Sequence, residues 1–400
     1  MKIISVVGAR PNFMKIAPFT KAIADYNQKN PQEKVEHILV HTGQHYDIRM
    51  SDAFFTELNI PAPDINLEIG SGSHAEQVGH TMIAFEKVLV EHIPDWVVIV
   101  GDVNATLSCS VTAKKMNIRV CHIESGLRSG DMTMPEEINR LVADRLSDLL
   151  LTPDKISSRN LVKEGVSENK IKFVGNIMID TLEANRSKAN LLEFDDIISR
   201  NLINANPGIS INEPVLSYSS KAGTEIILPV ICPIVLMTLH RPSNVDNVEV
   251  LTPLIHFLIN EVAMQYPIVW PIHPRTLKQL QKFKLLEKVN NCKNFMLLEP
   301  VGYVEMLRLN TGARMMFTDS GGLQEECCVL GTPCLTLRWN TERPITLREH
   351  GGASVLVGNN VENIKAEYYN TLQLNIKPFI PELWDGHAAE RCLEAILRMS

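Results

Sequence analysis

The segment from Trp96 to Ile123, WVVIVGDVNATLSCSVTAKKMNIRVCHI, decides the fold. It begins with an apolar run over residues 96–100, continues through a helical stretch over 105–115, and ends in a second β-rich run over 119–123. A strand, a helix and another strand in this order are typical of a βαβ unit with parallel strands. The segment therefore predicts an α/β protein.

The same alternation extends over the whole first half of the chain. Further strands are predicted at residues 2–7, 37–41, 149–152 and 172–174, and further helices at 13–26, 74–92 and 136–146. This pattern favours a doubly wound domain, in which ligands bind beyond the carboxyl ends of the strands.

The alternation fails between about Asn201 and Gly223, where Asn, Ser, Gly and Pro predict a linker. A second series of strands follows at 233–238, 268–271, 294–298, 315–318 and 334–337. We expect two doubly wound, Rossmann-like domains facing a central cleft, at residues 1–180 and 181–384. The last helical stretch, within 385–400, is expected to pack back on the first domain.

Composition excludes several classes of protein. The 400 residues suit two domains, and 45% hydrophobic against 21% charged residues is typical of a soluble globular protein. No apolar run approaches the roughly 20 residues of a bilayer span, and the first residues lack the h-region of a signal peptide. We expect a cytoplasmic protein without membrane insertion. The net charge of -7 argues against nucleic acid as a partner.

Cysteine and histidine spacing does not indicate a metal site. The eight cysteines contain no CxxC pair, and Cys327 and Cys328 are adjacent. His41 and His45 flank Thr-Gly-Gln, which indicates a strand leading into a loop rather than one face of a helix. We expect neither a metal ion nor a disulfide framework.

The segment TDSGGLQEE, from Thr318 to Glu326, carries the strongest binding signal. It follows a predicted strand and opens a helix, which Ser320 is expected to cap. Gly321 and Gly322 let a ligand approach the backbone, and helix N-termini favour anions. A diphosphate fits this position, with Glu326 as a partner for ribose hydroxyls, although an ordinary capped helix also explains Ser-Gly-Gly.

The first loop, GARPNFMK, places Arg10 and Lys15 after a strand, as phosphate partners or surface cations. It is not GxGxxG, and no acidic residue is positioned for an NAD ribose, so we reject a nicotinamide cofactor.

Three acidic residues lie at the ends of predicted elements in the first domain. Asp102 and Glu124 close two strands, and Glu136 starts a helix that also carries Arg140. Purely structural roles would explain these acids as a helix cap at Asp102 and a salt bridge between Glu136 and Arg140. Alternatively, the three acids share one rim, where close carboxylates push their pKa values apart and supply an acid and a base. In the second half, His240 and Arg343 also follow strands, and a histidine there can relay a proton.

In combination these motifs resemble the non-hydrolysing UDP-N-acetylglucosamine 2-epimerase family nearly end to end. The matching segments are GARPNFMKIAP, GDVNATL, HIESGLRSGD, MPEEINR, GNIMID, HRPSN, TDSGGLQEE, TERP and DGHAAER. The resemblance implies a glycosyltransferase-B-like fold, a cytoplasmic homodimer, a UDP-sugar substrate, and neither metal nor nicotinamide. It places the active site at Arg10, Lys15, Asp102, Glu124, Glu136, Arg140 and His240. It places UDP or substrate contacts at Ser320, Gly321, Gly322, Glu326 and Arg343.

The resemblance also implies a reaction: UDP is eliminated to leave a 2-acetamidoglucal, then added back with inversion at C2. Departures from the family bear on regulation and substrate. Gln44 and His45 match a region where some members bind a second UDP-GlcNAc, but Gly72-Ser73 replaces an expected Arg-Gln pair. The segments HTGQHYD and GSGSHAEQ resemble a branch that acts on modified sugars. UDP-GlcNAc is the expected substrate, with UDP-2,3-diacetamido-glucuronate or an acetamido-6-deoxy sugar as alternatives. A glycosyltransferase of the same fold, or a binding module without catalysis, are the other hypotheses.

Overall fold

The structure, a computed structural model, describes residues 1–43, 62–203 and 233–399. Contacts divide the chain into two compact units. Unit 1 comprises Met1–Asn185, Glu342–Ile345 and Ile380–Ser400, and unit 2 comprises Arg186–Thr341 and Thr346–Phe379. The chain passes from unit 1 to unit 2 within helix α7 (Ile177–Asn190). Most of the predicted linker, from residue 204 to 223, lies outside the described residues.

Unit 1 is built on a parallel sheet of seven strands among the described residues, in the order β3-β2-β1-β4-β5-β6-β7. The strands are β1 (Lys2–Val7), β2 (Glu36–His41), β3 (Ile65–Asn66), β4 (Trp96–Val100), β5 (Arg119–Ile123), β6 (Leu149–Thr152) and β7 (Ile171–Phe173).

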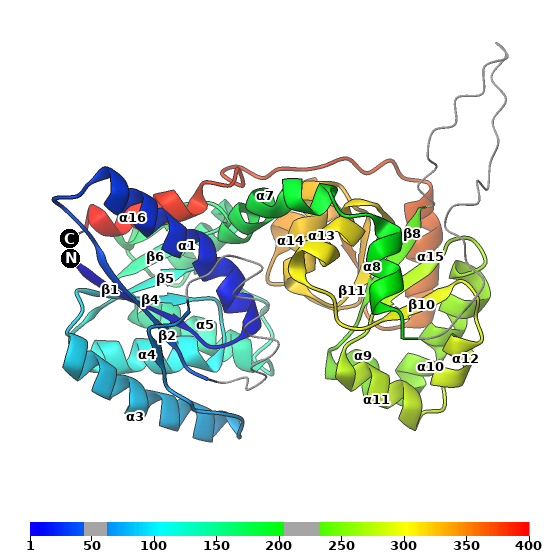
Figure 1. Ribbon diagram of the computed structural model, residues 1–400, viewed down its shortest axis with the longest axis horizontal. Coiled ribbons are helices and arrows are strands. Elements are labelled where there is room, and N and C mark those ends of the chain that lie inside the picture. Colours follow the sequence, from blue (N-terminus) through cyan, green and yellow to red (C-terminus); the bar gives the residue numbers. More distant parts are fainter. Residues whose placement is uncertain (44–61, 204–232, 400) are drawn as a thin grey trace, which may run out of the picture. The chain divides into compact units, whose positions relative to one another are not determined.

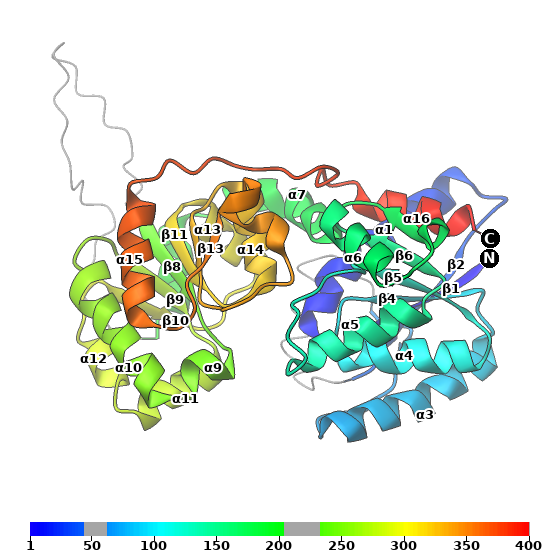
Figure 2. The same cartoon turned by 180° about the vertical axis from the view of Figure 1, so that it is seen from behind.

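Helices cover both faces of this sheet. In Figures 1 and 2, α3 (His74–His92), α4 (Asn104–Lys115) and α5 (Pro135–Leu146) lie on one face, and α1 (Arg10–Lys29) and α16 (Ala388–Leu397) on the other. The helices α6 (Lys155–Lys163) and α7 complete the unit. Alternate residues of β4 explain the packing: Val97 and Ile99 join a buried cluster with Phe85 of α3.

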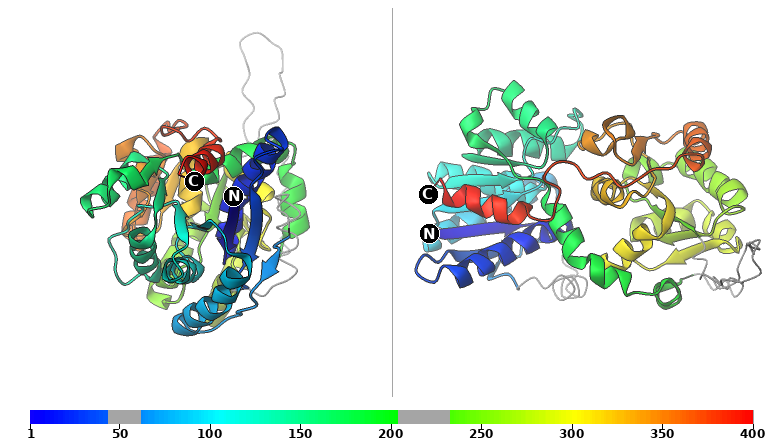
Figure 3. Two further views of the ribbon diagram at one scale, coloured as in Figure 1. Left: turned by 90° about the vertical axis from the view of Figure 1, so that its left-hand side faces the viewer. Right: turned by 90° about the horizontal axis from the view of Figure 1, so that it is seen from above.

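The C-terminal helix α16 lies beside α1 in every view (Figures 1 to 3). The carboxylate of Asp180, on α7, accepts the backbone N–H groups of Ala388 and Ala389 at 3.1 and 2.7 Å. A helix start leaves such groups without partners inside the helix, so Asp180 satisfies two of them.

Unit 2 holds a second parallel sheet, in the order β10-β9-β8-β11-β12-β13. Its strands are β8 (Ile234–Thr238), β9 (Ile268–Pro271), β10 (Phe295–Leu298), β11 (Ala313–Thr318), β12 (Cys334–Thr336) and β13 (Ser354–Leu356). Its helices are α8 (Phe194–Asn201), α9 (Pro242–Val245), α10 (Val248–Phe257), α11 (Pro274–Lys282), α12 (Leu286–Asn290), α13 (Tyr303–Thr311), α14 (Gly321–Leu330) and α15 (Val361–Leu372).

The central strand β8 is buried on both faces. Val235 and Met237 belong to one hydrophobic core, whereas Ile234 and Leu236 belong to another. Because side chains alternate along a strand, this division places one core on each face of the sheet. The predicted fold class, two doubly wound parallel α/β sheets, is therefore confirmed.

Each sheet has one point at which the strand order reverses. In unit 1 this point lies between β1 and β4, and in unit 2 it lies between β8 and β11. Connections leave such a pair in opposite directions, so a crevice opens at the carboxyl ends of the two strands. Every helix among the described residues is too short or too polar to span a bilayer.

Candidate active site

The predicted site residues of unit 1 gather at the carboxyl ends of β1, β4 and β5. Lys15, on α1, is only 5% exposed and forms an ion pair with Oε2 of Glu124, which follows β5. Gly101 separates the strand β4 from Asp102. A Cβ on Gly101 would lie 3.1 Å from Nζ of Lys15, and the residue has φ +68°, so only glycine suits this position.

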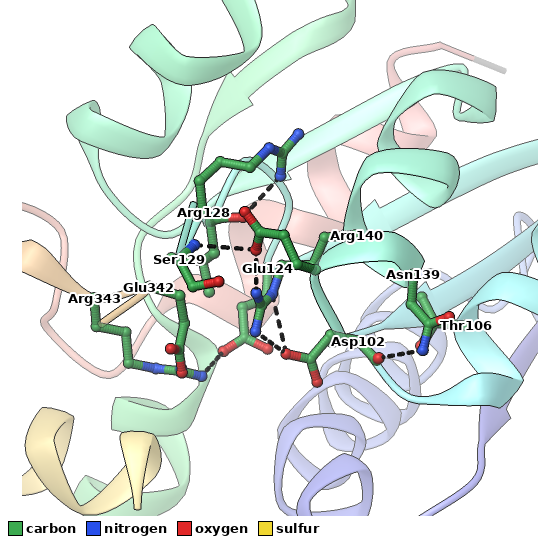
Figure 4. A network of polar contacts seen from close by, with 12 residues as sticks. Asp102, Thr106, Glu124, Arg128, Ser129, Asn139, Arg140, Glu342 and Arg343 are labelled. Atoms are coloured by element: carbon green, nitrogen blue, oxygen red, sulfur yellow. Dashed lines mark hydrogen bonds and ion pairs between the residues drawn. The ribbon is translucent and has the colours of Figure 1, made fainter. Parts of the chain in front are cut away.

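The backbone of Glu124 adopts a conformation that is unfavourable for most residues. Its φ is 71°, a left-handed conformation that is uncommon for a side chain other than glycine. Its second carboxylate oxygen accepts a hydrogen bond from Arg343 at 2.9 Å (Figure 4). Arg343 belongs to the segment Glu342–Ile345 of unit 1 and is also paired with Glu342. Glu124 is thus enclosed by two cations.

Asp102 forms an ion pair with Arg140 of α5 at 2.6 Å (Figure 4). Burial would raise the pKa of Asp102, but Arg140, and then Lys15 and Arg343, outweigh burial and hold the pKa below its ordinary value. Asp102 does not cap the following helix, because the N-cap of α4 is Val103. The carboxylate is therefore ionised at neutral pH and faces a group of cations.

The salt bridge considered between Glu136 and Arg140 is not present. Glu136 is exposed, and the acid that pairs with Arg140 is its neighbour Glu137, which is 2% exposed. Glu137 also accepts the N–H groups of Ser129 and Gly130. Burial opposes ionisation of Glu137, but those amides and Arg140 lower its pKa. Both acids stand within one turn of Arg140, and the loop amides of Ser129 and Gly130 hold Glu137 in the buried position that pairs with it.

Asn12 supports the loop before α1. Its Oδ1 accepts the N–H groups of Gly8 and Ala9, both at 3.1 Å, and its Nδ2 donates to the carbonyl of Val100 at 3.0 Å. Asn12 therefore ties the end of β1 to the end of β4. The side chain of Arg10, predicted as a phosphate partner, lies outside the described residues, as do Gln44 and His45.

In unit 2, His240 and Asp319 meet where β8 and β11 end. Nδ1 of His240 lies 2.9 Å from Oδ1 of Asp319, which is fully buried. Asp319 also accepts the backbone N–H of Arg241 at 2.9 Å and Nδ2 of Asn244 at 3.0 Å. Burial would raise the pKa of Asp319, but His240 and these donors hold it below its ordinary value. Asp319 is thus an ionised partner that orients the histidine.

Ser320 is the N-cap residue of α14, but its side chain makes no capping hydrogen bond, contrary to the expectation. Its backbone N–H donates to Oγ1 of Thr318 at 3.0 Å. Gly321 and Gly322 form the first turn of α14 and neither has a positive φ. Their backbone N–H groups are therefore directed out of a regular helix N-terminus, which favours an anion.

Glu326 lies deeper in α14, with 3% exposure. Burial raises the pKa of Glu326 to about 8, against smaller lowering effects of Asn310 and Tyr303. The carboxyl group is therefore largely neutral at pH 7 and can donate as well as accept a hydrogen bond.

Several residues of the two sites were not singled out from the sequence. Glu137 and Asn12 lie inside recognised motifs, but no periodicity separates Glu137 from Glu136, because both stand within one turn of Arg140. His273 follows β9 as His240 follows β8, and their rings lie 5.9 Å apart. Asp319 lies one residue before the predicted helix cap. In the described parts of the chain, no three His, Cys, Asp or Glu side chains are placed to hold a metal ion.

Comparison with known proteins places the chain in a family. A family model described as UDP-N-acetylglucosamine 2-epimerase matches residues 27–209 and 216–397. A UDP-N-acetylglucosamine 2-epimerase of Methanocaldococcus jannaschii is 40% identical over 365 residues, which cover 91% of this chain and 90% of the relative. The chain belongs to the UDP-N-acetylglucosamine 2-epimerase family. The resemblance found in the sequence is thereby confirmed.

Solved structures of the family have the same fold. The crystal structure of Methanocaldococcus jannaschii UDP-GlcNAc 2-epimerase, in complex with UDP-GlcNAc and UDP, superposes with a TM-score of 0.82 at 38% identity and full coverage of both chains. A lipopolysaccharide outer core galactosyltransferase reaches a TM-score of 0.51 at 13% identity, which shows the shared glycosyltransferase-B-like fold alone.

One relative within the epimerase family acts on a modified sugar. A UDP-2,3-diacetamido-2,3-dideoxy-D-glucuronate 2-epimerase of Pseudomonas aeruginosa is 33% identical over 402 residues, with full coverage of both chains. Members of one family thus differ in the substituents of the sugar.

Proposed function

We propose that this epimerase interconverts UDP-GlcNAc and UDP-ManNAc by eliminating UDP and adding it back. The observation that carries the proposal is the cluster of Asp102 and Glu124 with Lys15, Arg140 and Arg343. Carboxylates held beside cations can remove and return protons while remaining ionised between turnovers.

In the elimination step, a carboxylate removes the proton from C2 and the bond between C1 and the diphosphate oxygen breaks. The electron pair of the C–H bond forms the double bond between C1 and C2, and UDP leaves with the electrons of the C1–O bond. Asp102 suits the role of base, because Arg140, Lys15 and Arg343 keep its pKa low despite burial. In the return step, the diphosphate oxygen of UDP bonds to C1 and the electron pair of the C1–C2 double bond takes a proton on the opposite face of C2. The carboxylate that delivers this proton takes it from solvent, and the first base releases the proton it removed to solvent, so each returns to its starting state. We assign that delivery to Glu124 or Glu136, since one carboxylate cannot serve both faces.

The leaving diphosphate must be stabilised and retained. We assign it to the N-terminus of α14, at Ser320, Gly321 and Gly322, and to His240. Because the carboxylate of Asp319 accepts from Nδ1 of His240, Nε2 is the nitrogen that would face the ligand. Donors fixed in advance stabilise a developing anion most effectively. Arg10 is a further proposed phosphate partner, and Glu326 a proposed ribose partner.

Incubation with UDP-GlcNAc alone, followed by NMR, tests the function. The expected result is UDP-ManNAc, and in deuterium oxide both UDP-sugars should carry deuterium at C2, because a removed proton exchanges with solvent. Epimerisation without label would reject proton abstraction. A glycosyltransferase would leave UDP-GlcNAc unchanged until an acceptor was added, and a binding module would leave it unchanged in any case.

A modified UDP-acetamido sugar is the second candidate substrate. The full-length similarity to the Pseudomonas aeruginosa enzyme favours it. Parallel measurements of kcat/KM with UDP-GlcNAc and with UDP-2,3-diacetamido-glucuronate decide between the two, because that ratio measures discrimination in the transition state.

We also propose that the enzyme is a cytoplasmic homodimer. Helix α3 exposes Ile83 and Val90, and Ile93 follows it, with exposed fractions of 60%, 63% and 76%. Ile83 and Val90 are two turns apart on one side of α3, and exposed apolar side chains on one side of a helix would be covered in a dimer. The chain has a mass of 44.9 kDa. Light scattering after size-exclusion chromatography should give twice this mass.

A further inference from the structure

A buried ion pair lies directly behind the two acids of unit 1. His122, the fourth residue of β5, is fully buried, and its Nδ1 lies 2.6 Å from Oδ1 of Asp144 on α5. Its Nε2 lies 2.9 Å from the carbonyl oxygen of Gly101. Both ring nitrogens therefore face oxygen atoms that can accept hydrogen bonds.

Asp144 extends the ion pair to the next loop. Its other oxygen accepts the backbone N–H of Gly126 at 3.0 Å and lies 2.7 Å from the guanidinium of Arg128. Burial would raise the pKa of Asp144, but His122 and Arg128 outweigh it and lower the pKa. The carboxylate is therefore ionised, and it contacts three donors: His122, the backbone N–H of Gly126, and Arg128.

The backbone atoms that this pair holds flank the two acids. Gly101 immediately precedes Asp102, and Gly126 lies two residues after Glu124. Both glycines and Glu124 have positive φ, at 68°, 80° and 71°. At Gly126 a Cβ would lie 2.4 Å from the carbonyl oxygen of Ser157, so this loop also runs against α6. Glycine adopts a positive φ freely, but at Glu124 this conformation persists only where surrounding bonds determine it.

We propose that His122 and Asp144 are positioning residues, which fix the loops after β4 and β5 and so aim Asp102 and Glu124 at the sugar. A buried ion pair is a weak stabilising device, because desolvation of the two charges offsets much of their attraction. Its hydrogen bonds to Gly101 and Gly126 instead fix the backbone beside Asp102 and Glu124. This matters for the reaction, because misplacement of a catalytic group by about 1 Å costs roughly 10²-fold in rate. The inference rests on the proposed epimerase function.

Two amide variants separate the bonds of His122. The amide nitrogen of glutamine overlies Nε2 of a histidine, whereas that of asparagine overlies Nδ1. His122→Asn therefore loses the donor to Gly101, and kcat for epimerisation should fall about 10²-fold, with KM changed by less than about threefold. His122→Gln keeps that donor and should recover at least about tenfold of the loss. The affinity for UDP, assigned to unit 2, should be unchanged in both variants.

A matched control is His37→Asn, in the same sheet, where Nε2 of His37 meets Oγ of Ser5 at 2.9 Å. It should leave kcat near the wild-type value. Equal losses of kcat in His122→Asn and His122→Gln, or losses that follow the drop in melting temperature across all three variants, would overturn the positioning role.

If His122→Asn does not fold, Asp144→Asn replaces it. The amide oxygen still accepts from Gly126, but the charge that faces His122 is removed, so kcat should again fall while KM stays nearly constant. Unchanged kcat in folded Asp144→Asn would overturn the inference. Absence of epimerisation by the wild-type protein would instead refute the proposed function, so the two failures are distinguishable.

Discussion

At the scale of single residues, Asp102 and Glu124 differ from ordinary surface acids because they pair with buried cations, whereas Glu136 is exposed. Asp102→Asn, Glu124→Gln and Glu136→Gln each keep the shape of the side chain but remove proton transfer. We expect kcat to fall by roughly 10² to 10⁴ in each, with a smaller change in KM.

The matched control is Asp148→Asn, because Asp148 accepts the N–H of Val120 at the opposite end of the same sheet. Its kcat for epimerisation should stay close to that of the wild type. Near wild-type turnover in all three site variants would show that the cluster is structural.

Glu326 should make the stability of unit 2 depend on pH. Burial raises its pKa from 4.5 to about 8 in the folded chain. Between these values the folded state holds a proton that the unfolded state has released, so stability is highest below the unfolded pKa and falls as pH rises toward 8. From pH 5.5 to 7.5 the loss due to this group should be about 2 kcal/mol.

Glu326→Gln removes this titration while keeping a neutral group of the same size. Chemical denaturation at the two pH values should therefore show a smaller loss of stability in the variant than in the wild type. Equal losses would mean that Glu326 is ionised in the folded chain.

Some residue-level features could be predicted from sequence and others could not. Lys15, Asp102 and Glu124 were found because each follows a strand of a recognisable βαβ unit. Their ion-pair partners come from distant segments: Arg343 is 219 residues from Glu124. His122 and Asp144, which are 22 residues apart, meet only because β5 and α5 pack together. No local pattern encodes such pairs.

At the scale of elements, the apolar strands of both sheets were predictable because buried parallel strands appear as short continuous hydrophobic runs. The edge strands β3 and β13 were missed. They contain only two and three residues, too few for a periodic pattern to develop. Glu137 was not distinguished from Glu136, because both positions neighbour Arg140 on α5 and the loop amides that bury Glu137 leave no local pattern in the sequence.

The N-terminus of α14 gives a prediction at the same scale. Gly321 is the first residue of this helix and its φ is not positive, so alanine can adopt the same backbone conformation. Gly321→Ala should leave the melting temperature unchanged or raise it, because alanine favours a helix more than glycine does. It should weaken UDP binding by at least about tenfold, or 1.4 kcal/mol, because the methyl group stands where a phosphate approaches the amides.

Gly79→Ala, within α3, is the matched control. A Cβ at Gly79 would meet no atom within 4 Å. This substitution should stabilise the helix by up to about 1 kcal/mol without changing the affinity for UDP. Calorimetric titration with UDP measures the affinity of both variants. Equal affinities would show that the diphosphate does not bind at the N-terminus of α14.

At the scale of the whole molecule, each unit has its own sheet and its own buried cores. The chain crosses between them more than once, since Glu342–Ile345 and Ile380–Ser400 belong to unit 1. The return of the last helix could be expected from the apolar-periodic stretch after Trp384-Asp385-Gly386. The return of Glu342–Ile345 to unit 1, which brings Arg343 to Glu124, could not be expected, because TERP gives no signal of its partner.

This division predicts how the molecule responds to UDP. A ligand stabilises the part of the chain that binds it by RT ln(1 + [L]/Kd), which is about 2.7 kcal/mol at a hundredfold excess over Kd. Because the diphosphate and ribose contacts are assigned to α14 and β8 of unit 2, UDP should slow hydrogen exchange and raise the unfolding temperature more in unit 2 than in unit 1. Hydrogen exchange read by mass spectrometry separates the units, and Gly321→Ala should abolish most of the difference. Equal protection of both units, or greater protection of unit 1, would place the nucleotide elsewhere and withdraw the role given to unit 2.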